Sequence, residues 1–96
     1  MAKGYWITLY RSVSKPTALA EYAQKALPVI ESGGGHFLVR GPARKAYEDG
    51  VLDRCVVIEF DSVERAVAVY ESSEYQAAAK LLTGAVERDV RMAEGT

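Results

Sequence analysis

Four short segments of the chain have the residue pattern of β-strands. Residues 5–11, 36–40 and 54–60 are rich in aromatic and β-branched residues and contain no Gly or Pro. Residues 86–92 alternate, with apolar Val86, Val90 and Met92 on one side of the expected strand and charged side chains on the other. Since residues 54–60 are apolar on both faces, we expect them to form a central strand covered on both sides.

The segments between these strands have apolar residues at spacings of three and four, which is typical of amphipathic helices. The first helix is expected to begin at Pro16 and to end at the glycines that start with Gly33. The second is expected to follow Asp61 as its N-cap and to restart at Ser73, which begins a Ser-x-x-Gln capping box, before Gly84 ends it.

The resulting element order, β-α-β-β-α-β, predicts an α+β fold of the ferredoxin-like type in one domain spanning residues 1–96. In this fold both helices lie on one face of a four-stranded antiparallel sheet. Alternation along the first strand gives the other face bulky residues, from the set Trp6, Thr8 and Tyr10 or the set Tyr5, Ile7 and Leu9. We therefore expect two chains to pair face to face as a homodimer with a shared, barrel-like core.

Composition excludes several classes of function. The 96 residues contain 12 Lys and Arg and 13 Asp and Glu, so the net charge is −1 and no nucleic-acid partner is expected. One Cys and one His cannot build a metal cluster or a disulfide within one chain, and we expect no metal and no cofactor. Neither a signal peptide nor a membrane span is evident, which indicates a cytoplasmic protein in which Cys55 is a small buried hydrophobe.

Two residues are candidates for acid–base catalysis. His36 could serve as a general base, because histidine titrates near neutral pH; the alternative is a solvent-edge residue at the start of a strand. Glu59 could also accept a proton. It is the nearest counter-charge to Arg54 along the strand, but a separation of five residues places the two side chains on opposite faces.

Three arginines on expected strands are candidates for ligand binding. Arg40, Arg54 and Arg88 are flanked by apolar residues, and a cation in a largely apolar pocket requires a carboxylate, a phosphate or another anionic partner. The alternative is that each side chain extends along apolar surface to reach water. We select Arg40 and Arg54 as binding residues and leave the role of Arg88 open.

Three aromatic residues could form the walls of such a pocket. The hydroxyls of Tyr70 and Tyr75 could bind a ligand oxygen, and Trp6 would supply apolar surface. The alternative for all three is packing between helix and sheet.

Four strings, in this order and spacing, resemble the DUF1330 family of small uncharacterised proteins within the dimeric α/β-barrel superfamily. They are KGYWI at 3–7, GGHFLVRG at 34–41, RCVVIEF at 54–60 and YESSEYQ at 70–76. The likeness runs from Lys3 to Gly95 and implies a ferredoxin-like dimer with no established reaction. The chain has Lys15 where the family has Asp before Pro, Ser73 where it has Pro, and Gly41-Pro42 where it has a double glycine.

These observations leave two main hypotheses of function. The first is a dimer that binds a small anionic or carbonyl-bearing organic molecule in a cleft near the sheet, anchored by Arg40. The second, which follows from the superfamily resemblance, is a cofactor-independent enzyme of the monooxygenase or isomerase type, with His36 or Glu59 as base and Arg40 or Arg54 stabilising an oxyanion. A third is an accessory protein whose dimer surface is its function.

Overall fold

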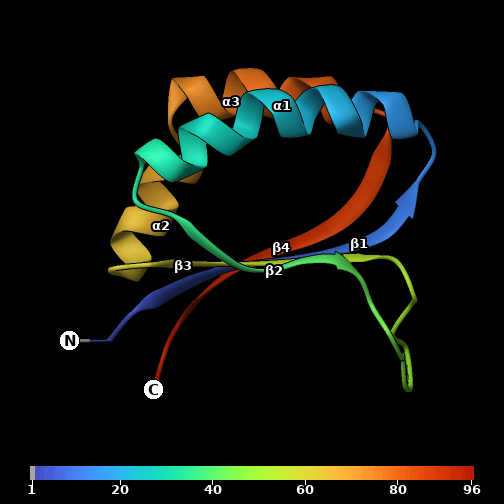
Figure 1. Cartoon of the computed structure of the whole chain (residues 1–96), viewed down its shortest axis with the longest axis horizontal. Helices are drawn as coiled ribbons and strands as arrows, with labels where there is room; N and C mark the ends of the chain where they lie inside the picture. The colour runs from blue at the N-terminus through green and yellow to red at the C-terminus, as the bar shows by residue number, and fades with distance from the viewer. Residues whose placement is uncertain (1) are drawn as a thin grey trace.

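A four-stranded antiparallel sheet forms one layer of the protein. The computed structural model describes residues 2–96. Its strands are β1 (Gly4–Val13), β2 (His36–Pro42), β3 (Arg54–Phe60) and β4 (Val86–Glu94), in the spatial order β2-β3-β1-β4 (Figure 1). The ferredoxin-like α+β fold expected from the element order is confirmed, with β3 and β1 as the central strands.

The helices form the second layer, on one face of this sheet (Figure 1). They are α1 (Pro16–Ser32), α2 (Val63–Tyr70) and α3 (Ser73–Ala79), and α3 is followed by a 3₁₀ turn, η1 (Lys80–Leu82). The expected helix caps are wrong by one residue: Ser62 rather than Asp61 accepts from the backbone N–H of Arg65, and Ser72 rather than Ser73 caps α3. In each polar pair the residue in extended conformation is the cap.

Strand alternation divides the sheet into an inner face, which the helices cover, and an outer face. Trp6, Thr8 and Tyr10 of β1 and Val56, Ile58 and Phe60 of β3 are buried on the inner face. Cys55 and Val57 lie on the outer face and are only partly buried. The expected burial of Cys55 is only partial, because on the outer face of β3 this residue borders a hollow shared with residues 43–53 instead of packing beneath a helix.

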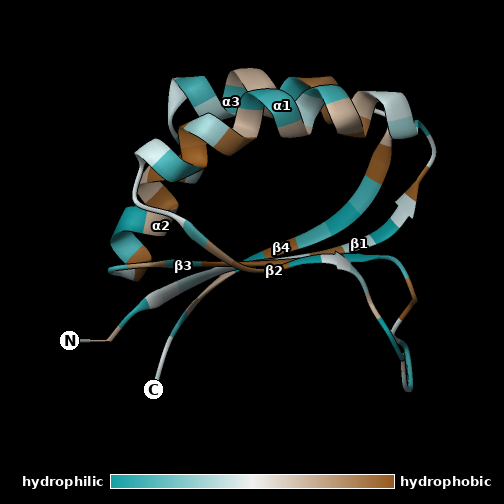
Figure 2. Ribbon diagram, in the orientation of Figure 1, coloured by the Kyte–Doolittle hydropathy of each residue, from teal (hydrophilic) through white to brown (hydrophobic). Residues whose placement is uncertain are grey.

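The loop of residues 43–53 joins β2 to β3 and projects from the sheet on the side away from the helices (Figure 1). It carries exposed Tyr47, Val51 and Leu52, the last two forming a short hydrophobic stretch in an otherwise hydrophilic segment (Figure 2). The exposed apolar residues of the molecule therefore gather on the outer face of the sheet and on this loop.

No helix within residues 2–96 has both the length and the apolar character that a membrane crossing requires.

Candidate functional site

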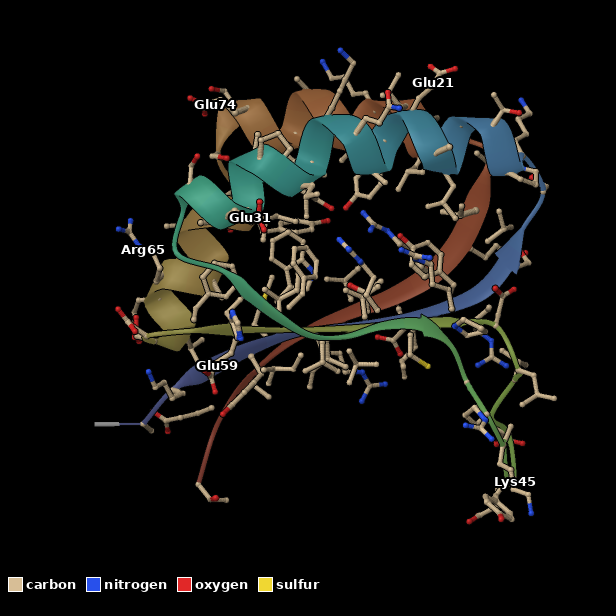
Figure 3. The ribbon with its side chains drawn as sticks, viewed as in Figure 1. Glu21, Glu31, Lys45, Glu59, Arg65 and Glu74 are labelled. Carbon is tan, nitrogen blue, oxygen red and sulfur yellow. The ribbon has the colours of Figure 1, made fainter. Side chains whose placement is uncertain are left out.

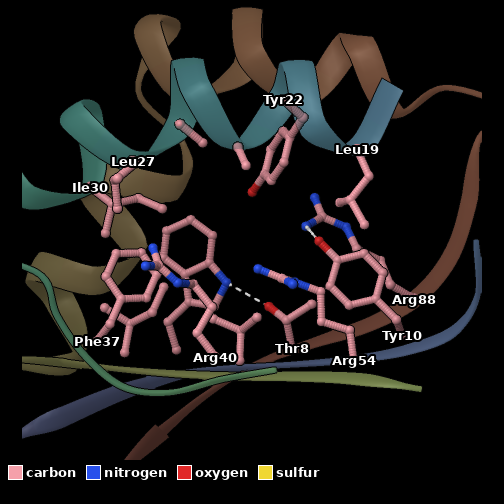
Figure 4. A pocket seen from close by; sticks show the side chains of 15 residues that line it. Thr8, Tyr10, Leu19, Tyr22, Leu27, Ile30, Phe37, Arg40, Arg54 and Arg88 are labelled. Carbon is pink, nitrogen blue, oxygen red and sulfur yellow. Dashed lines mark hydrogen bonds between the residues drawn. The ribbon is translucent and has the colours of Figure 1, made fainter. Parts of the chain in front are cut away.

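A cavity of about 40 Å³ lies between α1 and the inner face of the sheet (Figure 4). All four strands and α1 contribute to its wall. The lining side chains with polar groups are those of Trp6, Thr8, Tyr10, Tyr22, Arg40, Arg54 and Arg88. The remaining wall is apolar and includes Leu27, Ile30 and Phe37, and no Asp or Glu belongs to the lining. The cavity is thus a partly apolar space with three positive charges and no negative one.

A β-bulge brings Arg40 to the cavity. In the pairing of β2 with β3, Phe37 faces Ile58 and Val39 faces Val57, so Leu38 is the extra residue. Strict alternation from Phe37 would direct Arg40 to the outer face, whereas the bulge aligns it with buried Val56. The Arg40 guanidinium lies exposed at the cavity, 4.8 Å from the centre of the Phe37 ring.

Arg88 is held in place by tyrosines. Its Nη2 donates to the hydroxyl of Tyr75 at 3.0 Å, and its Nη1 makes a longer contact, 3.5 Å, with the hydroxyl of Tyr10. The guanidinium also lies over the rings of Tyr10 and Tyr22, at 5.8 and 5.4 Å from their centres. Burial by itself would lower the pKa of Arg88, but the oxygens of Tyr75 and Tyr22 outweigh it and raise that pKa, so the side chain stays charged.

None of the three arginines has a carboxylate partner within residues 2–96. Within residues 2–96 the ion pairs are Lys3 with Asp61 and Arg91 with Asp89, and neither pair lines the cavity. The charge of a buried arginine is normally paired with an acidic side chain, or its long side chain reaches water. Here rings and hydroxyls surround Arg88 instead, and the three guanidinium groups reach the cavity from β2, β3 and β4 (Figure 4).

Of the three aromatic residues expected to form walls, Trp6 lines the cavity, whereas Tyr70 and Tyr75 do not. Tyr75 is fully buried behind it, where its hydroxyl meets that of Tyr22 at 2.6 Å, and burial raises the pKa of Tyr75 well above its ordinary value. Tyr70 packs edge-on against Trp6 and borders a separate hollow next to Met92. Tyr75 is therefore connected to the cavity only through its hydrogen bonds with Tyr22 and Arg88.

His36 and Glu59 lie on the other side of the sheet. They face each other across β2 and β3, and the hydroxyl of Tyr5 donates to Glu59 Oε2 at 2.9 Å, which raises the pKa of Tyr5. Glu59 lies below the strands in Figure 3, away from the helices. Neither residue lines the cavity. The structure brings the two candidate bases together, but not with the candidate arginines.

Sequence reasoning missed Thr8, Tyr10 and Tyr22 as site residues. Each is buried on the inner side and each places a hydroxyl at the cavity. Thr8 and Tyr10 share the face of Trp6 by simple alternation, which is the signal that could have identified them. Tyr22 lies in the apolar stripe of α1, where a tyrosine is usually interpreted as core.

The described residues contain no group of three or more His, Cys, Asp or Glu side chains close enough to hold a metal ion.

Comparison with known proteins assigns the family. The model of the family described as a domain of unknown function, DUF1330, matches residues 3–96. The chain belongs to the DUF1330 family. No curated protein matches it.

Solved structures similar to this DUF1330 chain share its fold at low sequence identity. A Rhodopseudomonas palustris protein of unknown function is 21% identical, with a TM-score of 0.75 over 99% of this chain and 83% of that one. A dimeric ferredoxin-like protein of unknown function from Bacteroides fragilis is 19% identical, with a TM-score of 0.62 over 96% and 95%. A Nitrosomonas europaea protein described as a candidate antibiotic biosynthesis monooxygenase is 11% identical, with a TM-score of 0.61 over 98% and 89%. At these identities the likeness concerns the fold alone.

Proposed function

We propose that this DUF1330 protein is a homodimer that binds a small organic anion in the cavity between α1 and the inner face of the sheet. The observation that carries the proposal is the convergence of Arg40, Arg54 and Arg88 on a cavity with no carboxylate in its wall. Guanidinium groups in a partly apolar space are stabilised by an anion, and charge-assisted hydrogen bonds to carboxylate are among the strongest that proteins form.

The shape and wall of the cavity support a small ligand with an apolar part. The space of about 40 Å³ accommodates an acid group, while Leu27, Ile30 and Phe37 offer contacts to a hydrocarbon or aromatic portion. Arg40 is exposed, so its side chain can move aside without unpacking the core. A ligand larger than this space can therefore extend outward past Arg40.

The outer face supports the homodimer. Leu9 is 43% exposed and Val39 46%, and both lie beside half-buried Ile7 and Val57 on the outer face. An apolar sheet face of this kind favours association with a second chain. The ferredoxin-like relative from Bacteroides fragilis is described as dimeric, which agrees with this proposal.

The enzyme hypothesis receives less support from the geometry. A monooxygenase description attaches to two of the fold relatives, but His36 and Glu59, the two residues considered as bases, do not reach the cavity. The proposal therefore concerns binding, and it retains from the sequence the expectations of a cytoplasmic location and no nucleic-acid partner.

Calorimetric titration with benzoate tests the binding proposal. Benzoate combines one carboxylate with one apolar ring. Because a hydrogen bond to a charged group contributes about 1.5–3 kcal/mol, Arg54→Gln is expected to weaken benzoate binding by at least about tenfold. Arg65→Gln is the matched control, since Arg65 is exposed on α2 and does not line the cavity. Absence of benzoate binding, or equal affinity of Arg54→Gln and wild type, would overturn the proposal.

A further inference from the structure

The hydroxyl groups around the cavity form a hydrogen-bond chain whose direction can be deduced. Arginine only donates, so the Tyr75 oxygen must accept the 3.0 Å bond from Arg88 Nη2. The hydrogen of the Tyr75 hydroxyl then needs its own acceptor, and the Tyr22 oxygen lies 2.6 Å away. Tyr75 is fully buried, so leaving this hydrogen unpaired would carry a desolvation penalty.

The Tyr22 hydroxyl therefore accepts from Tyr75 and has its own hydrogen free to donate. Tyr22 is 8% exposed, and its hydroxyl points from α1 toward the cavity (Figure 4). Among residues 2–96 its oxygen also faces the Arg88 guanidinium, which can donate to it but cannot accept the Tyr22 hydrogen. The only place left for its hydrogen is the cavity itself.

Two further hydroxyls, both on β1, also accept a hydrogen bond through their oxygen and keep their hydrogen free to donate. Thr8 Oγ1 accepts from the indole Nε1 of Trp6 at 3.0 Å, and the Tyr10 oxygen is the acceptor in its contact with Arg88. Thr8 is 2% exposed and Tyr10 3%, and neither hydroxyl donates to another group in the described chain. Their hydrogens, like that of Tyr22, are available only to a molecule in the cavity.

We propose that the polar wall of this cavity consists entirely of hydrogen-bond donors, with the chain Arg88 to Tyr75 to Tyr22 directing the Tyr22 hydroxyl hydrogen onto a ligand carboxylate. This deepens the proposed function and rests on it. The ligand group that matches is a carboxylate, which accepts at both oxygens and carries no hydrogen of its own. Tyr22 contacts the ligand, and Tyr75 is a positioning residue that acts through Tyr22.

A double-mutant cycle with benzoate as the probe tests this inference. Tyr22→Phe removes the donor and is expected to weaken benzoate binding about tenfold. Tyr75→Phe leaves the cavity wall intact but frees Tyr22 to turn its hydrogen away, and a several-fold loss is expected. If Tyr75 acts through Tyr22, the double variant binds no more weakly than Tyr22→Phe alone. A merely structural role of Tyr75 would instead add its own loss to the double variant.

Tyr70→Phe is the matched control, because Tyr70 packs beside Trp6 and Tyr75 but does not line the cavity. Thermal unfolding of each variant establishes that it is folded. Should Tyr75→Phe fail to fold, Tyr22→Phe and Tyr10→Phe decide the matter, and each must weaken benzoate binding while Tyr70→Phe does not. Wild-type affinity in Tyr22→Phe overturns this inference but leaves the proposed function standing if Arg54→Gln still loses affinity. Failure of wild type to bind benzoate overturns both.

Discussion

The two faces of the sheet come from the same four strands, yet they differ in what covers them and in how their charges are paired. On the inner face, Thr8 and Tyr10 meet Arg54 and Arg88 around a small cavity beneath α1. On the outer face, one residue further along the same strands, Leu9 and its neighbours present aliphatic surface to solvent. The covered side thus holds cations without a carboxylate partner, whereas on the outer face Arg91 pairs with Asp89 and Tyr5 donates to Glu59.

This contrast indicates that each face has a different missing partner. Helices from the same chain already cover the inner face, so its cations lack only a counter-ion, and a small molecule can supply one. No helix of residues 2–96 covers the outer face, and a second sheet is the natural cover. A charged substitution on the inner face should therefore unfold the chain, whereas the same substitution on the outer face should dissociate the dimer.

The largest effect is expected from Ile58→Asp on β3. Ile58 is 1% exposed on the inner face, and there the desolvation of a carboxylate and the lost packing of Ile58 outweigh its attraction to the arginines of the cavity. We expect a loss of more than about 4 kcal/mol in the free energy of unfolding, which leaves the chain unfolded. Circular dichroism measures this directly. Val57→Asp, the adjacent residue on the outer face, is the control and should retain its helical signal; cooperative unfolding of Ile58→Asp would refute the assignment of the inner face.

Val57→Asp should instead break the dimer. The carboxylate would lie in the middle of the outer face, opposite Ile7 of β1, where a second sheet would have to bury it. Sedimentation equilibrium is expected to show the mass of a folded monomer for this variant and of a dimer for wild type. Ala77→Asp, on the exposed side of α3, should remain dimeric. A wild-type monomer would contradict the proposed role of the outer face.

A smaller effect concerns stability at high pH. Burial raises the folded-state pKa of Tyr75 above 10.0, the ordinary value that applies to the unfolded chain. The stabilising contribution of neutral Tyr75 is therefore complete below pH 10.0 and is lost as pH rises toward the folded-state pKa. The unfolding temperature should be level to about pH 9 and then fall. Tyr75→Phe should fall less steeply, whereas Tyr47→Phe, an exposed control, should follow wild type.

The smallest effect distinguishes two glycines. A Cβ on Gly35 would lie 2.6 Å from Ile30 Cγ2 and 2.9 Å from Phe60 Cζ, so Gly35→Ala should cost about 1–3 kcal/mol by overpacking the inner side. A Cβ on Gly41, whose strand partner Cys55 belongs to the outer face, would meet no atom within 4 Å. Gly41→Ala should change the free energy of unfolding by less than about 0.5 kcal/mol in a urea titration. Equal losses in both variants would argue against the tight inner packing.

The order and type of the elements could be predicted because period-two and period-3.6 patterns of apolar residues directly reflect burial. Helix caps were harder to place, because Asp61-Ser62 and Ser72-Ser73 each offer two capable side chains and only the backbone conformation selects one. The family was also accessible from the sequence, since its strings span the whole chain.

The cavity was only half predictable. Arg40 and Arg54 could be selected because a cation among apolar residues is unusual, but the side on which Arg40 lies depends on a bulge at Leu38 that alternation does not reveal. His36 and Glu59 are candidates by residue type alone. Their pairing across the outer face depends on the register of β2 against β3, which the sequence of one strand does not define. Tyr22 could not be selected from the sequence, because the direction of its hydroxyl depends on hydrogen bonds that link it through Tyr75 to Arg88.

The strand order has a consequence for synthesis on the ribosome. β1 is made first, yet both of its neighbours, β3 and β4, are encoded after the loop of residues 43–53. During translation, β1 therefore waits with two unpaired edges while α1 and β2 emerge, and such edges invite aggregation or chaperone capture. Arg88 arrives with the last strand of the sheet, so the nascent chain has no complete cavity until β4 has docked.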